Sequence, residues 1–257
     1  MSQTKVDADS WILLYFAMVW LTGAGILYSN NGYHTGFLTL NQLGHVVPSQ
    51  IWQVVTFLGD ENLLLSLALL TFRRHPAYAK ALFWAVLCGF LLTRSMKEGF
   101  NTMRPPLVLA ADSFHLVGSI HKHHSFPSGH TQLIFTVMGS LYLYTNWRLI
   151  KFLALILAVL VGFSRIAVGV HWPIDVCVGA SVGLVAAWSG FWLAKHYPLQ
   201  PIPGYYLLIG LLLMNFPIQL VIGYDSGLEI PNLIGPAIGW LVLAKLFWDF
   251  CATTEVV

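Results

Sequence analysis

His171 and Asp175 form a pair of side chains whose types and spacing could do chemistry. Pro173 lies between them, and a helix accepts proline in its first turn, so we expect a helix to begin here. Residues four apart on a helix share a face, so the imidazole and the carboxylate can meet. Ser164 and Arg165, at the end of the preceding apolar segment, add a guanidinium. The pattern predicts that a histidine and a carboxylate contact each other at the start of a helix, with a guanidinium nearby.

A second segment of interest is Phe126-Pro127-Ser128-Gly129-His130, which opens another apolar stretch. Ser128 is of a type that caps helix N-termini. The free amides of Gly129 and His130 would then face an anion at the positive end of the helix. The segment therefore predicts a cradle for phosphate or another oxyanion.

Two cations, Lys97 and Arg104, form the third cluster. They are seven residues apart, two helical turns, so on a continuous helix both would point from one face. Pro105 would then end that helix. We expect both cations to converge on the same site.

The composition identifies the elements that must position these side chains. Hydrophobic residues make up 57% of the 257-residue chain and charged residues only 9%, whereas an average soluble domain has about 25% charged residues. Aromatic residues reach 14%, and such rings gather where lipid meets headgroups. The chain is expected to be an all-α, polytopic membrane helical bundle. A net charge of +2 without charge runs argues against nucleic acid, and three cysteines predict no fixed disulfide.

Eight apolar stretches approach the roughly 20 residues that a helix needs to cross a bilayer. They cover residues 11–28, 51–72, 81–96, 129–147, 152–168, 173–194, 205–224 and 230–248. Three prolines and a glycine follow Lys195 and indicate a linker. We therefore expect a six-helix core at residues 1–195, with the motifs within 97–175, and a linker with a C-terminal two-helix hairpin at 196–257.

The positions of Lys and Arg in the short loops predict the orientation of the chain. They lie before span one, between spans two and three, between four and five, and after six: Lys5, Arg73, Arg74, Lys80, Arg148, Lys151 and Lys195. Loops rich in such cations stay cytoplasmic, so the N-terminus is expected there. Alternating spans place the three clusters together on the opposite, extracytoplasmic face, which is the periplasmic face of a bacterial inner membrane.

Together the clusters would provide three cations, backbone amides, two histidines and a carboxylate. Phosphoryl transfer through a phosphohistidine requires this set of groups. Such a site needs no metal and no cofactor.

Over residues 53–194 the chain resembles the type 2 phosphatidic acid phosphatase family. The resemblance rests on three intact motifs in order: Lys97-x6-Arg104-Pro105, Pro127-Ser128-Gly129-His130 and Ser164-Arg165-x5-His171-x3-Asp175. It implies that His171 is the nucleophile, that Asp175 orients it, and that His130 protonates the leaving alkoxide. It further implies that the phosphate oxygens are bound by Lys97, Arg104, Ser128, Gly129 and Arg165.

The resemblance implies an integral membrane phosphatase of lipid metabolism. Its partners would be the bilayer and a phosphorylated lipid: phosphatidate or phosphatidylglycerophosphate, undecaprenyl diphosphate, or a lipid A phosphate. A lipid phosphotransferase, which passes the phosphoryl group to a lipid acceptor, is the near alternative. More distant alternatives are a vanadium haloperoxidase, against which the spans argue, and a non-enzymatic transporter or lipid-binding protein.

Three charged residues, Asp60, Glu61 and Arg94, fall inside apolar stretches. Intramembrane charges are costly and normally find partners, so a structural ion pair is expected. The functional alternative is that Asp60 or Glu61 orders Arg94 or Arg165 behind the phosphate site. A histidine-rich tract, residues 115–124, is expected to be a solvated or headgroup-facing loop without a metal.

Overall fold

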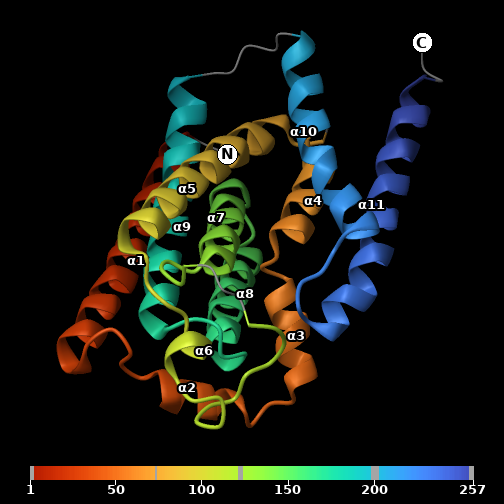
Figure 1. Cartoon of the computed structure of the whole chain (residues 1–257). Helices are drawn as coiled ribbons and strands as arrows, with labels where there is room; N and C mark the ends of the chain where they lie inside the picture. Colours follow the sequence, from red (N-terminus) through yellow and green to blue (C-terminus); the bar gives the residue numbers. More distant parts are fainter. Residues whose placement is uncertain (1–2, 73, 121–123, 198–202, 255–257) are drawn as a thin grey trace.

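The computed structural model describes residues 3–72, 74–120, 124–197 and 203–254, and within these ranges it contains helices and no strand. The helices are α1 (Gln3–Asn31), α2 (Phe37–Gly44), α3 (Ser49–Phe57), α4 (Glu61–Thr71), α5 (Pro76–Phe100), α6 (Pro105–Val108), α7 (Gly129–Tyr144), α8 (Arg148–Ala167), α9 (Pro173–His196), α10 (Pro203–Ile222) and α11 (Glu229–Thr254) (Figure 1). The expected all-α fold is confirmed.

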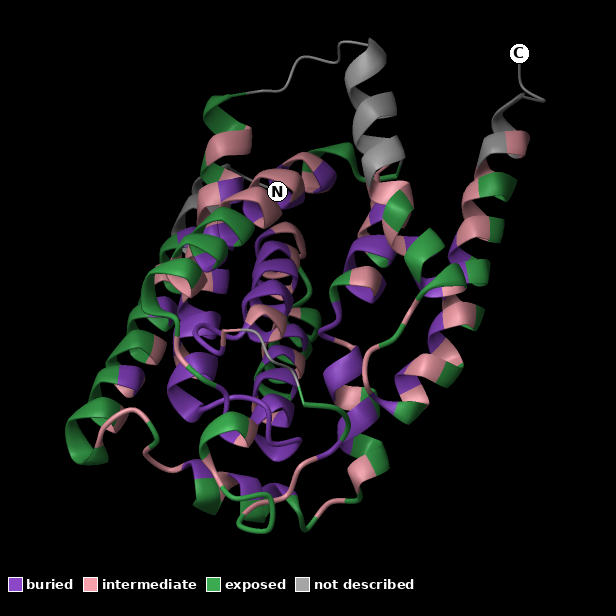
Figure 2. Ribbon diagram, in the orientation of Figure 1, coloured by how far each residue is buried: buried purple, intermediate pink, exposed green. Residues whose placement is uncertain are grey.

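The long helix α9 is central to the bundle and packs against α5, α7 and α1. Small residues on α9 allow this close approach: a Cβ added to Gly183 would lie 2.7 Å from Cβ of Phe135 on α7. Buried residues gather on α7 and on the parts of its neighbours that face it (Figure 2). The core thus holds α7 and α9 in fixed register.

Within the described ranges, five segments are long and apolar enough to cross a membrane. They are Ser10–Asn31, Pro76–Val108, Arg148–Ala167, Pro173–His196 and Glu229–Asp249. Many of their outward side chains are apolar and exposed, as lipid contact requires. The chain is an integral membrane protein.

The expected second span, residues 51–72, is broken. Helices α3 and α4 are bent by 44° relative to each other, and together they have the length and apolarity of one broken span or of a re-entrant loop. Asp60 explains the restart, because its side chain caps α4 by accepting hydrogen bonds from the amides of Asn62 and Leu63. Helix α7, with 16 residues, is shorter than the other central helices.

The continuous helix expected between Lys97 and Arg104 is also interrupted. Helix α5 ends at Phe100, and Asn101 adopts the left-handed conformation (φ 43°) that often ends a helix. Pro105 then begins the short helix α6 instead of ending a long one. The two cations therefore do not share one helical face, and the chain turn brings Arg104 inward.

The C-terminal hairpin of α10 and α11 packs against α4 and α3 at one side of the bundle (Figure 1). Its contact includes a small apolar core of Phe57, Leu63 and Leu220. The connection between the two helices is thereby held beside the break between α3 and α4.

Candidate active site

His171 and Asp175 meet at the start of α9, as the spacing predicted. Nδ1 of His171 lies 3.1 Å from Oδ2 of Asp175, and both side chains are buried. The same carboxylate oxygen accepts a 2.9 Å hydrogen bond from the amide of Trp172 and so caps the helix. The helix start thus fixes the carboxylate behind the imidazole.

Two further hydroxyls, which the sequence analysis did not single out, hold Asp175. Ser125 Oγ donates to Oδ2 of Asp175 at 2.5 Å and lies 3.4 Å from Nδ1 of His171. Tyr33, in the turn after α1, donates to Oδ1. Ser125 stands two residues before the Pro127 motif, which is a usable signal, whereas Tyr33 is distant from every motif in sequence.

Arg104 occupies the other side of the imidazole. Its Nη1 lies 3.1 Å from Nε2 of His171 and donates to the carbonyl of Val170, also at 3.1 Å. An arginine can only donate, so Nε2 is an acceptor and the ring proton lies on Nδ1, facing Asp175. This tautomer places the ring lone pair on Nε2, where it accepts the hydrogen bond from Arg104, so a phosphate would have to draw the guanidinium away before Nε2 could attack.

Lys97 and Arg165 complete the cationic side of the site. Lys97 Nζ donates to the carbonyl of His124 at 3.0 Å. Arg165 is only 5% exposed, and its Nη1 donates to Oγ1 of Thr56 at 2.5 Å. The Nε of Arg165 is buried without a hydrogen-bond partner among the described residues. Thr56, which the sequence did not single out, orients this guanidinium.

These groups surround a cavity of about 400 Å³. The predicted site residues that line it are Lys97, Arg104, Gly129, His130, Arg165 and His171, together with Asp60, Glu61 and Arg94. Ser128 is buried and caps α7 as expected, its Oγ accepting from the amide of Thr131 at 3.4 Å. Its hydroxyl is thus engaged in the helix cap, and its predicted contact with phosphate stays a prediction.

The acidic residues expected inside the membrane differ in their surroundings. Asp60 is buried, with Oδ2 lying 3.9 Å from Nε2 of His130. Glu61 is exposed at the cavity edge. The expectation that Arg94 is buried and pairs with one of them was wrong: Arg94 is exposed and pairs with Glu98 one turn away, at 2.5 Å. An i, i+4 pair on the helix surface satisfies it locally.

The charge state of His171 follows from its surroundings. Burial, and then the positive charges of Arg104 and Arg165, lower the pKa of His171 well below the usual value. The imidazole is therefore neutral at neutral pH, as a nucleophile must be.

Part of the histidine-rich tract can be placed. His115 Nε2 lies 3.1 Å from Oγ of Ser49, away from the cavity just described. His121, Lys122 and His123 lie outside the described residues.

Comparisons with known proteins agree with this arrangement. The family model of the PAP2 superfamily matches residues 77–200. Phosphatidylglycerophosphatase B of Bacillus subtilis is 30% identical over 166 residues, 58% of this chain and 74% of that protein. The crystal structure of LpxE from Aquifex aeolicus is similar with a TM-score of 0.54 and 29% identity, over 60% of this chain and 93% of that one.

Other relatives match at higher identity over shorter stretches. The bacitracin transport permease protein BcrC of Bacillus licheniformis is 45% identical over 73 residues, 27% of this chain and 34% of that protein. Across this and two further curated relatives, the chain spans only 31–44% of their length. The family match, the phosphatidylglycerophosphatase B alignment and the helical fold together show that the chain belongs to the PAP2 superfamily.

Proposed function

We propose that this protein is a membrane lipid phosphatase that works through a phosphohistidine on His171. The observation that carries the proposal is the position of His171, whose Nδ1 faces Asp175, whose Nε2 contacts Arg104, and which lines a cavity together with Lys97 and Arg165. Relatives of the chain include phosphatidylglycerophosphatase B and an undecaprenyl-diphosphatase, both named for lipid phosphate hydrolysis. The chemistry is assigned to the six-helix core, residues 1–195.

The reaction has two steps. Nε2 of His171 forms a bond to phosphorus while the ester P–O bond breaks, and His130 gives its proton to the leaving oxygen. Water then attacks the phosphohistidine, His130 takes a proton from that water, and the N–P bond breaks to release phosphate. Asp175 stabilises the imidazole by holding the Nδ1 proton, and the three cations with the Gly129 amide stabilise the phosphate oxygens.

The cavity explains why the substrate would be a lipid. Glu61, Leu65, Val86 and Phe90 line both the catalytic cavity and an adjoining groove of about 410 Å³ between α4, α5 and α10. Apart from Glu61 this groove is lined by apolar side chains. A phosphate beside His171 can therefore carry an acyl or prenyl tail that stays in an apolar environment.

The ends of the helices support a proposal for the membrane side of the site. The site lies where α5 and α8 end and where α7 and α9 begin, whereas Lys80, Arg148, Lys151 and Lys195 lie at the opposite ends of α5, α8 and α9. Positively charged loops stay in the cytoplasm. We therefore place the reaction at the extracytoplasmic face of a bacterial inner membrane.

Phosphate release from purified lipid phosphates in detergent tests the proposal. The wild type is expected to release phosphate from at least one lipid, with EDTA present, because no step uses a metal. His171→Ala is expected to release none, while the matched control His196→Ala, at the exposed end of α9, stays active. Full activity of His171→Ala, or loss of wild-type activity in EDTA, would contradict this mechanism.

A further inference from the structure

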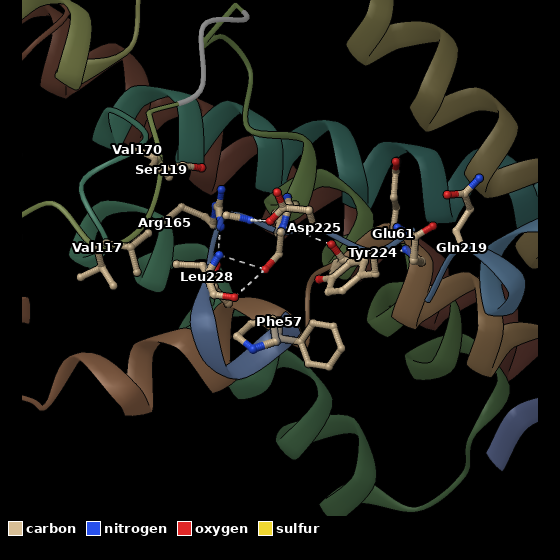
Figure 3. A pocket seen from close by; sticks show the side chains of 18 of the residues that line it. Phe57, Glu61, Val117, Ser119, Arg165, Val170, Gln219, Tyr224, Asp225 and Leu228 are labelled. Carbon is tan, nitrogen blue, oxygen red and sulfur yellow. Dashed lines mark hydrogen bonds and ion pairs between the residues drawn. The ribbon is translucent and has the colours of Figure 1, made fainter. Parts of the chain in front are cut away.

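The C-terminal hairpin forms one wall of a second cavity of about 250 Å³, whose lining side chains are drawn in Figure 3. This cavity shares lining residues with the catalytic one. Gln219, Tyr224 and Asp225 line it from the hairpin, and core residues line the opposite wall. The family match ends at residue 200, so these hairpin residues lie outside the matched region.

The wall that the hairpin contributes is fixed to the core. The amide of Ser119 donates to the carbonyl of Gly227 at 3.0 Å, and the amide of Ile230 donates to Oε1 of Gln53 at 2.9 Å. The ring of Tyr224 packs against Phe57 with centroids 5.7 Å apart. These contacts fix Tyr224 in the cavity wall, where its hydroxyl is buried without a hydrogen-bond partner among the described residues.

The two cavities share the residues closest to the chemistry. Asp60, Glu61, His130 and Arg165 line both of them. His130 is proposed to protonate the leaving oxygen and lines both cavities. The part of the substrate that carries this oxygen would therefore lie at the boundary between the two cavities. The partnerless Nε of Arg165 is buried at the same boundary, where a ligand oxygen would satisfy it.

The two cavities differ in charge where they do not overlap. Besides the shared Asp60, Glu61 and Arg165, the catalytic cavity contains Arg94, Lys97 and Arg104. Among its described residues, the hairpin cavity adds no lysine or arginine to the shared residues and adds the carboxylate of Asp225. A second phosphate would be repelled there, whereas carboxylate, amide and phenol groups are suited to hydroxyl groups.

We propose that the hairpin cavity binds the uncharged, hydroxyl-bearing unit that carries the phosphate, a glycerol or a sugar. The protein then prefers phosphorylated glycerol or sugar lipids over lipid diphosphates. This inference rests on the proposed phosphatase activity and assigns Tyr224 and Glu61 as specificity-determining residues.

The test compares kcat/KM for four lipids: phosphatidylglycerophosphate, a phosphorylated acyl disaccharide, phosphatidate and undecaprenyl diphosphate. The wild type is expected to favour at least one of the first two over both others, and which of them is favoured distinguishes glycerol from sugar. Tyr224→Phe is expected to lower that preference over phosphatidate by about 3–10-fold, the effect of one lost hydrogen bond. Tyr28→Phe, an exposed tyrosine on α1, is the matched control.

The second part of the test removes one negative charge from the cavity wall. Glu61→Gln is expected to raise kcat/KM for undecaprenyl diphosphate relative to the hydroxylated lipids, because the leaving phosphate then meets one carboxylate fewer. Phosphate release without preference for either hydroxylated lipid, or an equal loss on all lipids in Tyr224→Phe, would overturn the inference and leave the phosphatase proposal intact. No release from any lipid by the wild type would overturn both.

Discussion

The hydroxyl of Tyr33 donates a hydrogen bond to Oδ1 of Asp175, although 142 residues separate the two in the sequence. Burial, and next the Asp175 carboxylate, raise the pKa of Tyr33, so the phenol keeps its proton and remains a donor. With Ser125 on the other carboxylate oxygen, Asp175 is held from both sides while it faces His171.

Tyr33→Phe removes one donor from this carboxylate. Since hydrogen bonds to charged groups contribute about 1.5–3 kcal/mol, we expect kcat to fall about ten-fold or more. The carboxylate also becomes more basic, which raises the pKa of His171 and moves the acidic limb of the pH–rate profile to higher pH. If kcat falls while the acidic limb of the pH–rate profile stays at the same pH, Tyr33 only supports the fold.

Asp175→Asn is expected to have a larger effect. The carboxamide has no negative charge and has an NH2 donor in place of one carboxylate oxygen, so the imidazole loses the charged acceptor that holds its proton on Nδ1. By analogy with other oriented histidines we expect kcat to fall by roughly 10³-fold or more. Steady-state kinetics together with trapping of labelled phosphate on His171 measure this, and persistent labelling at the wild-type rate would contradict the role of Asp175.

The low pKa of His171 sets the pH dependence. Unfolded or exposed histidine titrates near 6.5, so below that pH the unfolded state binds the extra proton first. The stability that the neutral buried imidazole contributes is therefore present above pH 6.5 and is lost as the pH falls below it. Thermal unfolding in detergent from pH 5 to 8 should show the loss in the wild type and a weaker loss in His171→Ala.

Thr56→Val tests the support of Arg165. Valine keeps the shape of threonine but cannot accept the hydrogen bond from Nη1. We expect KM to rise about 3–10-fold with a smaller change in kcat, because the guanidinium is less well placed for the phosphate. Thr39→Val, on an exposed face of α2, serves as the control. Unchanged KM in Thr56→Val would show that Arg165 needs no such partner.

Gly183→Ala tests the close packing of α9 on α7. The added Cβ would lie 2.7 Å from Cβ of Phe135, so the helices must separate, at a cost of about 1–3 kcal/mol. Gly25→Ala, where the added Cβ meets nothing within 4 Å, should leave stability unchanged or slightly raise it. Melting temperatures in detergent compare the two, and equal values would contradict the packing argument.

The sequence predicted the helical class and the pairing of His171 with Asp175, because hydropathy and i, i+4 spacing are local properties. It also identified Ser128 as a helix cap from residue type alone. It did not predict the turn at Asn101, which replaces a continuous helical face. Tyr33 and Thr56 were missed because their roles depend on contacts with residues far away in sequence. The sequence analysis expected the wrong partner for Arg94, which pairs with Glu98. Hydropathy indicates how deep a residue lies in the membrane, but not the direction in which its side chain points.

Hydrogen bonds connect the chain segments that surround the site. The amide of Ser128 donates to the carbonyl of Asp175, Trp172 Nε1 donates to the carbonyl of Met103, and Arg104 contacts the carbonyl of Val170. None of these segments can reach its final position until α9 has joined α5 and α7. During synthesis and membrane insertion, the catalytic centre therefore forms late: a nascent chain that ends before α9 contains all three cations, Lys97, Arg104 and Arg165, but neither Asp175 nor an assembled site.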